Sequence, residues 1–106
     1  MPKYLLEASY SKEGAQGIRK AGGSARRTAV KELVEKAGGK LEAFYFAFGK
    51  SDAVLIVDLP DHSTALSLSI AVNSTGAVGL RTTVLVTPEE MDAAAKKSVD
   101  YRPPGS

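Results

Sequence analysis

The sequence predicts an α+β fold of the ferredoxin-like class, with the element order βαββαβ and an extra helix at the C-terminus. Two aromatic and β-branched runs between Lys40 and Pro60 flank the turn-forming segment Gly-Lys-Ser-Asp at 49–52, which is typical of a β-hairpin. Alternating segments at 3–10 and 79–87 supply two more strands, and segments with helical periodicity separate them from the hairpin. This order predicts one antiparallel sheet, with the first strand beside the third and the fourth and two helices on one face.

Length and composition indicate a single domain over residues 1–106, with an extended tail at 98–106. The 43% of hydrophobic residues is sufficient for one core. The 14 basic and 12 acidic residues leave a net charge of +2, which is too balanced to indicate a nucleic-acid or membrane partner.

The absence of cysteine excludes disulfides, thiolate metal sites and a cysteine nucleophile, and a single histidine excludes a multi-histidine metal site. We therefore expect no metal and no cofactor. No apolar run has the length of a signal peptide or of a membrane span, so a cytoplasmic protein is expected.

The first half of the chain predicts a strand and two helices. The strand at 3–10 alternates apolar and polar residues, and Ser11 caps a short helix that ends near Lys20. Gly22-Gly23 interrupts this helix, and Ser24 is the expected N-cap of a second one over 25–37. The second helix gathers its apolar residues on one face, and Gly38-Gly39 ends it.

In the second half, Pro60 ends the hairpin and Asp61 or Ser63 caps a helix over 64–74. Its apolar face is expected to contain Leu66 and Ile70 beside Asn73, and Ala65, Leu68 and Val72 widen the apolar surface. A fourth strand covers 79–87. Thr87, Pro88 and Glu90 form the pattern of a capping box with proline in the first turn, which predicts a last helix to about residue 97.

Alternation divides the strands into two faces. The set expected beneath the helices is Tyr4, Leu6, Ala8, Phe44, Phe46, Phe48, Val54, Ile56, Thr82, Val84 and Val86. The opposite set is Leu5, Glu7, Ser9, Leu41, Ala43, Tyr45, Ala47, Ala53, Leu55, Val57, Arg81, Thr83 and Leu85. No helix covers this second face in a ferredoxin-like fold, and an apolar patch of this kind usually marks an interface. We expect two copies to stack sheet against sheet, either enclosing a partly polar cavity or with fully interdigitated side chains.

The chain resembles the GYD domain family over nearly its whole length. The resemblance rests on Gly-Gly-Ser-Ala-Arg-Arg at 22–27, Gly-Gly-Lys-Leu-Glu-Ala-Phe-Tyr-Phe-Ala-Phe-Gly at 38–49, Arg-Thr-Thr-Val-Leu-Val-Thr-Pro-Glu-Glu-Met at 81–91 and Val-Asp-Tyr-Arg-Pro-Pro-Gly at 99–105. The family motif Gly-x-Tyr-Asp reads Gly49-Lys50-Ser51-Asp52 in this chain, with serine in place of tyrosine. The resemblance implies a dimeric α/β barrel, a superfamily that includes cofactor-free monooxygenases, isomerases, haem-degrading proteins and ligand-sensing modules.

A ligand site is expected on the second face, at Glu7, Tyr45, Arg81 and Thr83. Glu7 and Arg81 lie on adjacent strands in the predicted topology, where they form either a simple cross-strand ion pair or a pair that faces a ligand. A second candidate is an anion site at Ser24, Arg26 and Arg27, beside the glycine pair; the alternative is a helix break with a solvated basic face.

Tyr45, Asp52 and His62 are the candidates for proton transfer in a catalytic role. Each also has an ordinary structural interpretation, because an aspartate in a turn usually accepts hydrogen bonds from nearby backbone amides and a loop histidine is usually solvated.

The sequence thus favours a small homo-oligomeric module, at least a dimer, that binds a small molecule at the sheet face. Two alternatives stay open: a cofactor-free monooxygenase or isomerase, and a purely structural oligomer. The residue pattern leaves open whether the protein is an enzyme.

Overall fold

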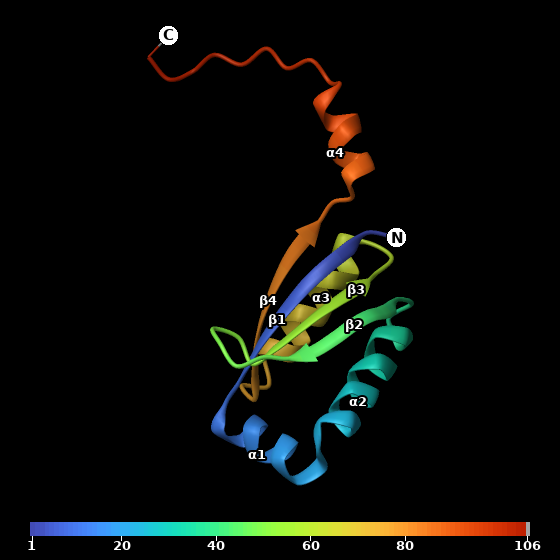
Figure 1. The fold of residues 1–106 in the computed structure, drawn as a ribbon, viewed down its shortest axis with the longest axis vertical. Coiled ribbons are helices and arrows are strands. Elements are labelled where there is room, and N and C mark those ends of the chain that lie inside the picture. The colour runs from blue at the N-terminus through green and yellow to red at the C-terminus, as the bar shows by residue number, and fades with distance from the viewer. Residues whose placement is uncertain (106) are drawn as a thin grey trace.

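The structure is a computed structural model that describes residues 1–105, and it has one antiparallel sheet of four strands in the order β2-β3-β1-β4. The predicted ferredoxin-like topology is therefore confirmed, with β1 between β3 and β4 (Figure 1). In chain order the elements are β1 Lys3–Tyr10, α1 Lys12–Ala21, α2 Gly23–Lys36, β2 Lys40–Phe46, β3 Ala53–Asp58, α3 His62–Asn73, β4 Val78–Leu85 and α4 Pro88–Ala95.

The hydrophobic core lies between one face of the sheet and helices α2 and α3. β1 contributes Tyr4 and Leu6, and the α2 side chains Val30 and Val34 pack against them. The rest of the buried cluster consists of Leu55, Val57, Leu59 and Ala65. Tyr4 is 1% exposed, which makes its ring one of the most completely buried side chains of the chain. Because burial of apolar surface is the main favourable term in folding, this layer holds the helices onto the sheet.

The face assignment of β3 was wrong. Leu55 pairs with both Phe44 and Leu6, and residues directly opposite each other in an antiparallel ladder lie on the same face of the sheet. Leu55 and Val57 are therefore buried beneath the helices, whereas Val54 and Ile56 point to the opposite face.

Two residues of the β2 segment also lie elsewhere than predicted. A β-bulge between Leu41 and Ala43 shifts the register of β2 on β3, so Leu41 packs against the core rather than on the opposite face. Phe48 was placed beneath the helices, but β2 ends at Phe46 and Phe48 is fully exposed in the connection to β3.

The helix starts are partly as predicted. Ser11 caps α1 by accepting a hydrogen bond from the backbone of Gly14, and Asp61 caps α3 by accepting one from Thr64. Ser24 is not the cap of α2: the helix begins at Gly23, and Gly22 takes the cap position with a φ of 91° that glycine adopts readily.

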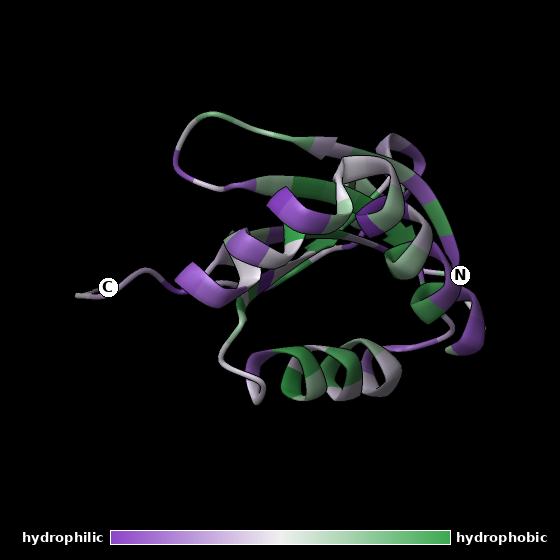
Figure 2. Cartoon of the chain, turned by 90° about the horizontal axis from the view of Figure 1, so that it is seen from below, coloured by the Kyte–Doolittle hydropathy of each residue, from purple (hydrophilic) through white to green (hydrophobic). Residues whose placement is uncertain are grey.

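The side of α3 that faces the sheet also differs from the prediction. Leu66 and Ile70 were expected to face the sheet, yet they are 63% and 67% exposed. The covered side is formed by the residues that were expected only to widen the apolar surface: Ala65 is buried, and Leu68 and Val72 are half-buried. α3 is apolar along most of its length (Figure 2), so its sequence pattern does not select one face.

The C-terminal segment projects from the domain. α4 has the predicted capping box between Thr87 and Glu90 and ends at Ala95. Every residue of α4 and of the following stretch to Gly105 is exposed, and the segment extends beyond the sheet (Figure 1). We call residues 88–105 the C-terminal arm. The predicted tail over 98–106 forms its distal half, except for residue 106, which lies outside the described residues.

Candidate functional site on the open face of the sheet

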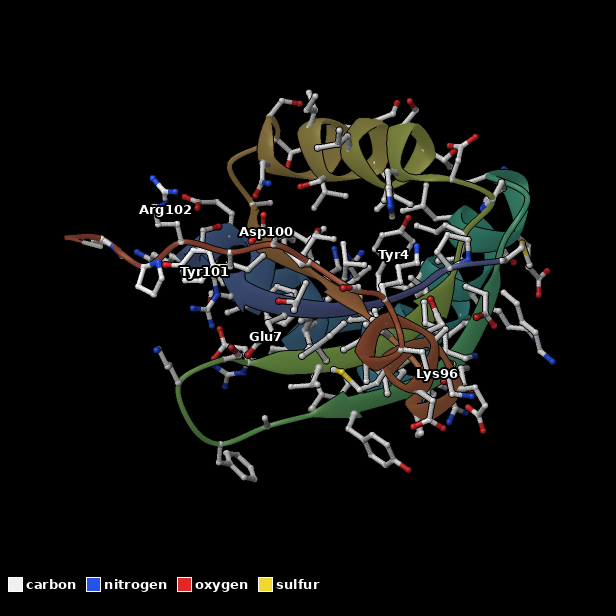
Figure 3. The ribbon with its side chains drawn as sticks, turned by 90° about the horizontal axis from the view of Figure 1, so that it is seen from above. Tyr4, Glu7, Lys96, Asp100, Tyr101 and Arg102 are labelled. Atoms are coloured by element: carbon white, nitrogen blue, oxygen red, sulfur yellow. The ribbon has the colours of Figure 1, made fainter. Side chains whose placement is uncertain are left out.

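The sheet face opposite α2 and α3, which we call the open face, carries the best candidate site. Tyr4 points toward α3, whereas Glu7 lies on the other side of β1 (Figure 3). The pairing registers place Tyr45, Val54, Glu7 and Arg81 side by side across the four strands. The next row along the strands consists of Ala43, Ile56, Leu5 and Thr83. The open face thus combines an apolar centre with a polar edge.

The polar edge is a cluster of three side chains, Glu7, Ser51 and Arg81. The Ser51 hydroxyl donates to Glu7 Oε2 at 3.3 Å and accepts from Arg81 Nη2 at 3.2 Å. Arg81 Nη2 also lies 3.4 Å from Glu7 Oε2, which completes the triangle. Glu7 and Arg81 face each other directly in the β1–β4 register. Their predicted proximity is therefore observed, and Ser51 links them.

The β2–β3 connection holds Ser51 in this position. Its neighbour Asp52 donates its backbone N–H to Ala8 O at 2.8 Å, and the Asp52 carboxylate accepts the Tyr10 N–H at 2.8 Å. These two bonds tie the connection to the end of β1, and Ser51 is only 5% exposed as a result. Arg81 and Glu7 keep exposed fractions of 55% and 30%. Groups of the arginine and the carboxylate therefore remain accessible from the open face.

The opposite end of the open face carries a second ionic group. Lys3 Nζ lies 2.8 Å from Asp58 Oδ1 and 3.1 Å from Glu42 Oε1. The hydrogen bond to Asp58 and then the bond to Glu42 raise the pKa of Lys3 above its ordinary value. This group has two carboxylates and one ammonium, so it is acidic overall, and it is solvent-accessible. Exposed ion pairs contribute little to stability, so the main effect of this group is a local excess of negative charge at the end of the apolar row.

Tyr45 and Thr83 share the open face with the cluster but do not bond to it. Tyr45 lies on the edge strand β2 and is 71% exposed. Val54 on β3 separates it from Glu7 in the same cross-strand row. Thr83 follows Arg81 by two residues and is exposed. Both side chains therefore belong to the same face as the cluster without contacting it.

His62 lies on the other side of the sheet, where it has a structural partner. Its Nδ1 is 2.5 Å from the hydroxyl of Tyr4, and the two rings pack edge to face. Burial raises the pKa of the Tyr4 hydroxyl, which therefore stays neutral and shares a hydrogen bond with the imidazole. A buried hydroxyl needs such a partner, so the histidine stabilises the core.

The three candidates for proton transfer are consequently not brought together within the chain. Tyr45 is on the open face, His62 contacts the core on the helix side, and Asp52 accepts a backbone hydrogen bond at the end of β1. General acid–base catalysis needs groups within hydrogen-bond reach of one substrate, and these positions do not meet that condition within a single chain.

The three residues of the expected anion site do not lie together in the structure. Ser24 and Arg27 line a hollow of about 240 Å³ beside the rings of Phe44 and Phe46. Arg26 points to a different space, where it lines a cavity beneath α1. The three residues therefore do not converge on one anion.

Ser51 is the site residue that the sequence reasoning missed. It stands at the third position of Gly49-Lys50-Ser51-Asp52, where the related motif has tyrosine, and that substitution was the available signal. A small hydroxyl at this position is compatible with the short distance between the connection and the Glu7–Arg81 pair.

Within residues 1–105, no group of three or more histidine or acidic side chains is placed to hold a metal ion. Over the same residues, none of the helices combines the length and the apolar character required to cross a bilayer.

In the comparison with protein families, the family model described as GYD domain matches residues 4–95. This range covers the four strands, except for Lys3 at the start of β1, and the helices from α1 to α4. None of the curated proteins compared with the chain matches it.

Proposed function

The chain belongs to the GYD domain family, and from this premise we propose that it is a homodimeric module that binds a small polar molecule between two stacked open faces. The observation that carries the proposal is the Glu7–Ser51–Arg81 cluster, which lies at the edge of an apolar sheet face that no helix covers. A buried serine between an acid and a base is well suited to hold both charged groups in fixed orientations.

A second copy of the chain is the proposed cover of the open face. The central row offers Leu5, Ile56 and Ala43, and the same row on a two-fold related copy is complementary to it. Four strands at a spacing of about 4.8 Å give the face a projected area of roughly 500 Å². A stable interface buries about 800 Å² per partner, so further surface must contribute. The projecting C-terminal arm supplies it.

The cluster favours a ligand that carries a carboxylate next to a hydrogen-bond donor. The exposed N–H groups of Arg81 match a carboxylate, since guanidinium binds planar oxyanions through paired hydrogen bonds. The exposed part of Glu7 accepts from an amine or hydroxyl of the same molecule. Beyond Val54 in the same cross-strand row, the exposed Tyr45 ring offers an apolar surface for a ligand body that extends across the face.

The dimer is tested by light scattering at micromolar concentration. Ile56→Asp places a charge in the centre of the proposed interface, and we expect this variant to be monomeric. Leu66→Asp is the matched control, because Leu66 is an exposed apolar residue on the outer side of α3. A monomeric wild type, or equal effects of the two substitutions, contradicts the dimer.

Ligand binding is tested by thermal shift and native mass spectrometry with a panel of amino acids and small hydroxy acids. We expect a stabilising compound whose effect is lost in Arg81→Gln and kept in Arg19→Gln, which removes an exposed arginine of α1. A dimer that responds to no compound in the panel supports the purely structural oligomer instead.

A further inference from the structure

A cavity of about 340 Å³ lies beneath α1, apart from the open face. Its walls come from α1, from the first turns of α2 and from the segment that leads into β4. Ile18, Ala29 and Val78 are among the side chains that make it largely apolar. This volume is within the range of small-molecule sites in proteins, where a mostly apolar lining surrounds a few polar groups.

Arg26 is the only charged residue in the lining. Its Nε atom is buried and has no hydrogen-bond partner within residues 1–105. None of the ion pairs among these residues involves Arg26. A guanidinium stays charged at every physiological pH, and a buried donor without an acceptor is unfavourable. The cavity therefore combines apolar walls with an uncompensated positive charge.

We infer that this cavity binds an amphipathic monocarboxylate, with its apolar body against α1 and its carboxylate on Arg26. The carboxylate would accept two parallel hydrogen bonds from the terminal N–H groups of the guanidinium, because the buried Nε is closed to solvent. Tyr10 also lines the cavity and adds an aromatic wall. This site is independent of the proposed site at Glu7, Ser51 and Arg81, and it takes a different class of ligand.

Gly17 of α1 offers a way to close the cavity without disturbing the fold. It lines the space, and a Cβ atom added there meets no atom within 4 Å. A larger side chain at this position therefore extends into the cavity and replaces the ligand. Leucine also favours helix more than glycine does, so Gly17→Leu retains α1.

The experiment is a calorimetric titration of the intact protein with octanoate, up to millimolar concentration. Octanol serves as the uncharged analogue and acetate as the anion without a chain. We expect octanoate to bind more tightly than either, because only octanoate satisfies both the walls and Arg26. In Arg26→Gln, the affinity should fall about tenfold through loss of a charge-assisted hydrogen bond.

Two further variants complete the test. Arg27→Gln is the matched control, since Arg27 is the adjacent arginine and lines a different hollow; its affinity for octanoate should match that of the wild type. Gly17→Leu should abolish binding while its thermal melt shows a folded protein. The inference is overturned if octanoate does not bind, if octanol binds equally well, if Arg27→Gln weakens binding as much as Arg26→Gln, or if Gly17→Leu still binds.

Discussion

At the scale of single residues, Ser51 links the loop between β2 and β3 to strands β1 and β4. Its hydroxyl contacts both Glu7 and Arg81, and its side chain is almost completely buried. The neighbouring Asp52 is fixed by backbone hydrogen bonds, which leaves Ser51 little freedom to move away from the pair. Residues of this kind affect stability and ligand recognition together, because removing one partner leaves the others partly unsatisfied.

We predict that Ser51→Ala lowers the free energy of unfolding by about 1–2 kcal/mol, because a buried hydroxyl with two hydrogen bonds is lost. Urea denaturation measures the change. Ser67→Ala is the control: Ser67 is exposed on α3, and its substitution should stay within about 0.5 kcal/mol of the wild type. Equal stability of Ser51→Ala and the wild type would contradict the proposed role of the hydroxyl.

The cap of α3 predicts a pH dependence. The hydrogen bonds from the Thr64 side chain and then from the Thr64 backbone lower the pKa of Asp61 below its ordinary value. The ionised form is therefore favoured in the folded state, and its contribution is present above the unfolded pKa of about 3.9 and is lost as the pH falls through the folded pKa. In Asp61→Asn, the amide oxygen still caps the helix but does not titrate.

We therefore expect the melting temperature of the wild type to fall more than that of Asp61→Asn between about pH 5 and pH 2, the interval in which Asp61 takes up its proton. Thermal melts of both proteins across this range measure the difference. Parallel curves would show that the cap does not titrate with a lowered pKa.

At the scale of elements, β3 contributes side chains to both faces of the sheet. It is a central strand with β1 on one side and β2 on the other, and its side chains alternate between the core and the open face. Leu55 contributes to folding within one chain, whereas Ile56 is available to a partner. One strand thus couples the stability of the subunit to the surface through which we propose that it dimerises.

Leu55→Ala should lower the free energy of unfolding by about 2–5 kcal/mol through loss of buried contacts and a residual cavity. Ile56→Ala should have less than half this effect at low protein concentration, because Ile56 is only half-buried in the single chain. Urea denaturation over a range of protein concentrations separates the two. If Ile56→Ala is as destabilising as Leu55→Ala in the most dilute sample, the observed faces of β3 are reversed.

At the scale of the whole molecule, the chain is more extended than a domain of its size. Its radius of gyration is 17.0 Å and its longest dimension is 57 Å, whereas a compact domain of this length has a radius of gyration of about 13 Å. The C-terminal arm accounts for the excess, since it extends beyond the sheet (Figure 1). It also exposes Met91, Val99 and Tyr101, which are large apolar side chains.

An arm of this kind gains most by packing on a second copy. Tyr101 and Arg102 are residue types that often anchor interfaces, and Pro103-Pro104 stiffens the chain after them, which reduces the entropy lost on docking. In the single chain Tyr101 and Arg102 are exposed and do not pack on their own sheet, so we predict contact with the partner subunit.

Truncation after Val99 should lower both the dimer affinity and the melting temperature, because the partner subunit would lose the contacts of Tyr101 and Arg102. Sedimentation and thermal melting measure the two quantities. A control truncation after Pro104, which keeps Tyr101 and Arg102, should behave like the full chain. If the protein cut after Val99 keeps the oligomeric state and melting temperature of the full chain, the end of the arm makes no such contact.

The sequence alone was sufficient for the order of the elements, the strand topology and the capping of α1 and α4, and it limited the cap of α3 to Asp61 or Ser63. These features depend on local signals: alternation in β1, cap residues at helix starts and turn-forming residues between the strands. The pairing of Glu7 with Arg81 could also be predicted, because it follows from strand order and alternation once the topology is known.

Only the tertiary structure decided which face of each uniformly apolar segment is buried. β3 and α3 carry apolar side chains on both sides, so periodicity gives no direction, and the choice follows from register and from packing against other elements. The bulge in β2 and the contact of Ser51 with residues 44 and 30 positions away depend on long-range geometry in the same way. A local pattern specifies an element, but burial is a property of the surfaces that the folded chain brings together.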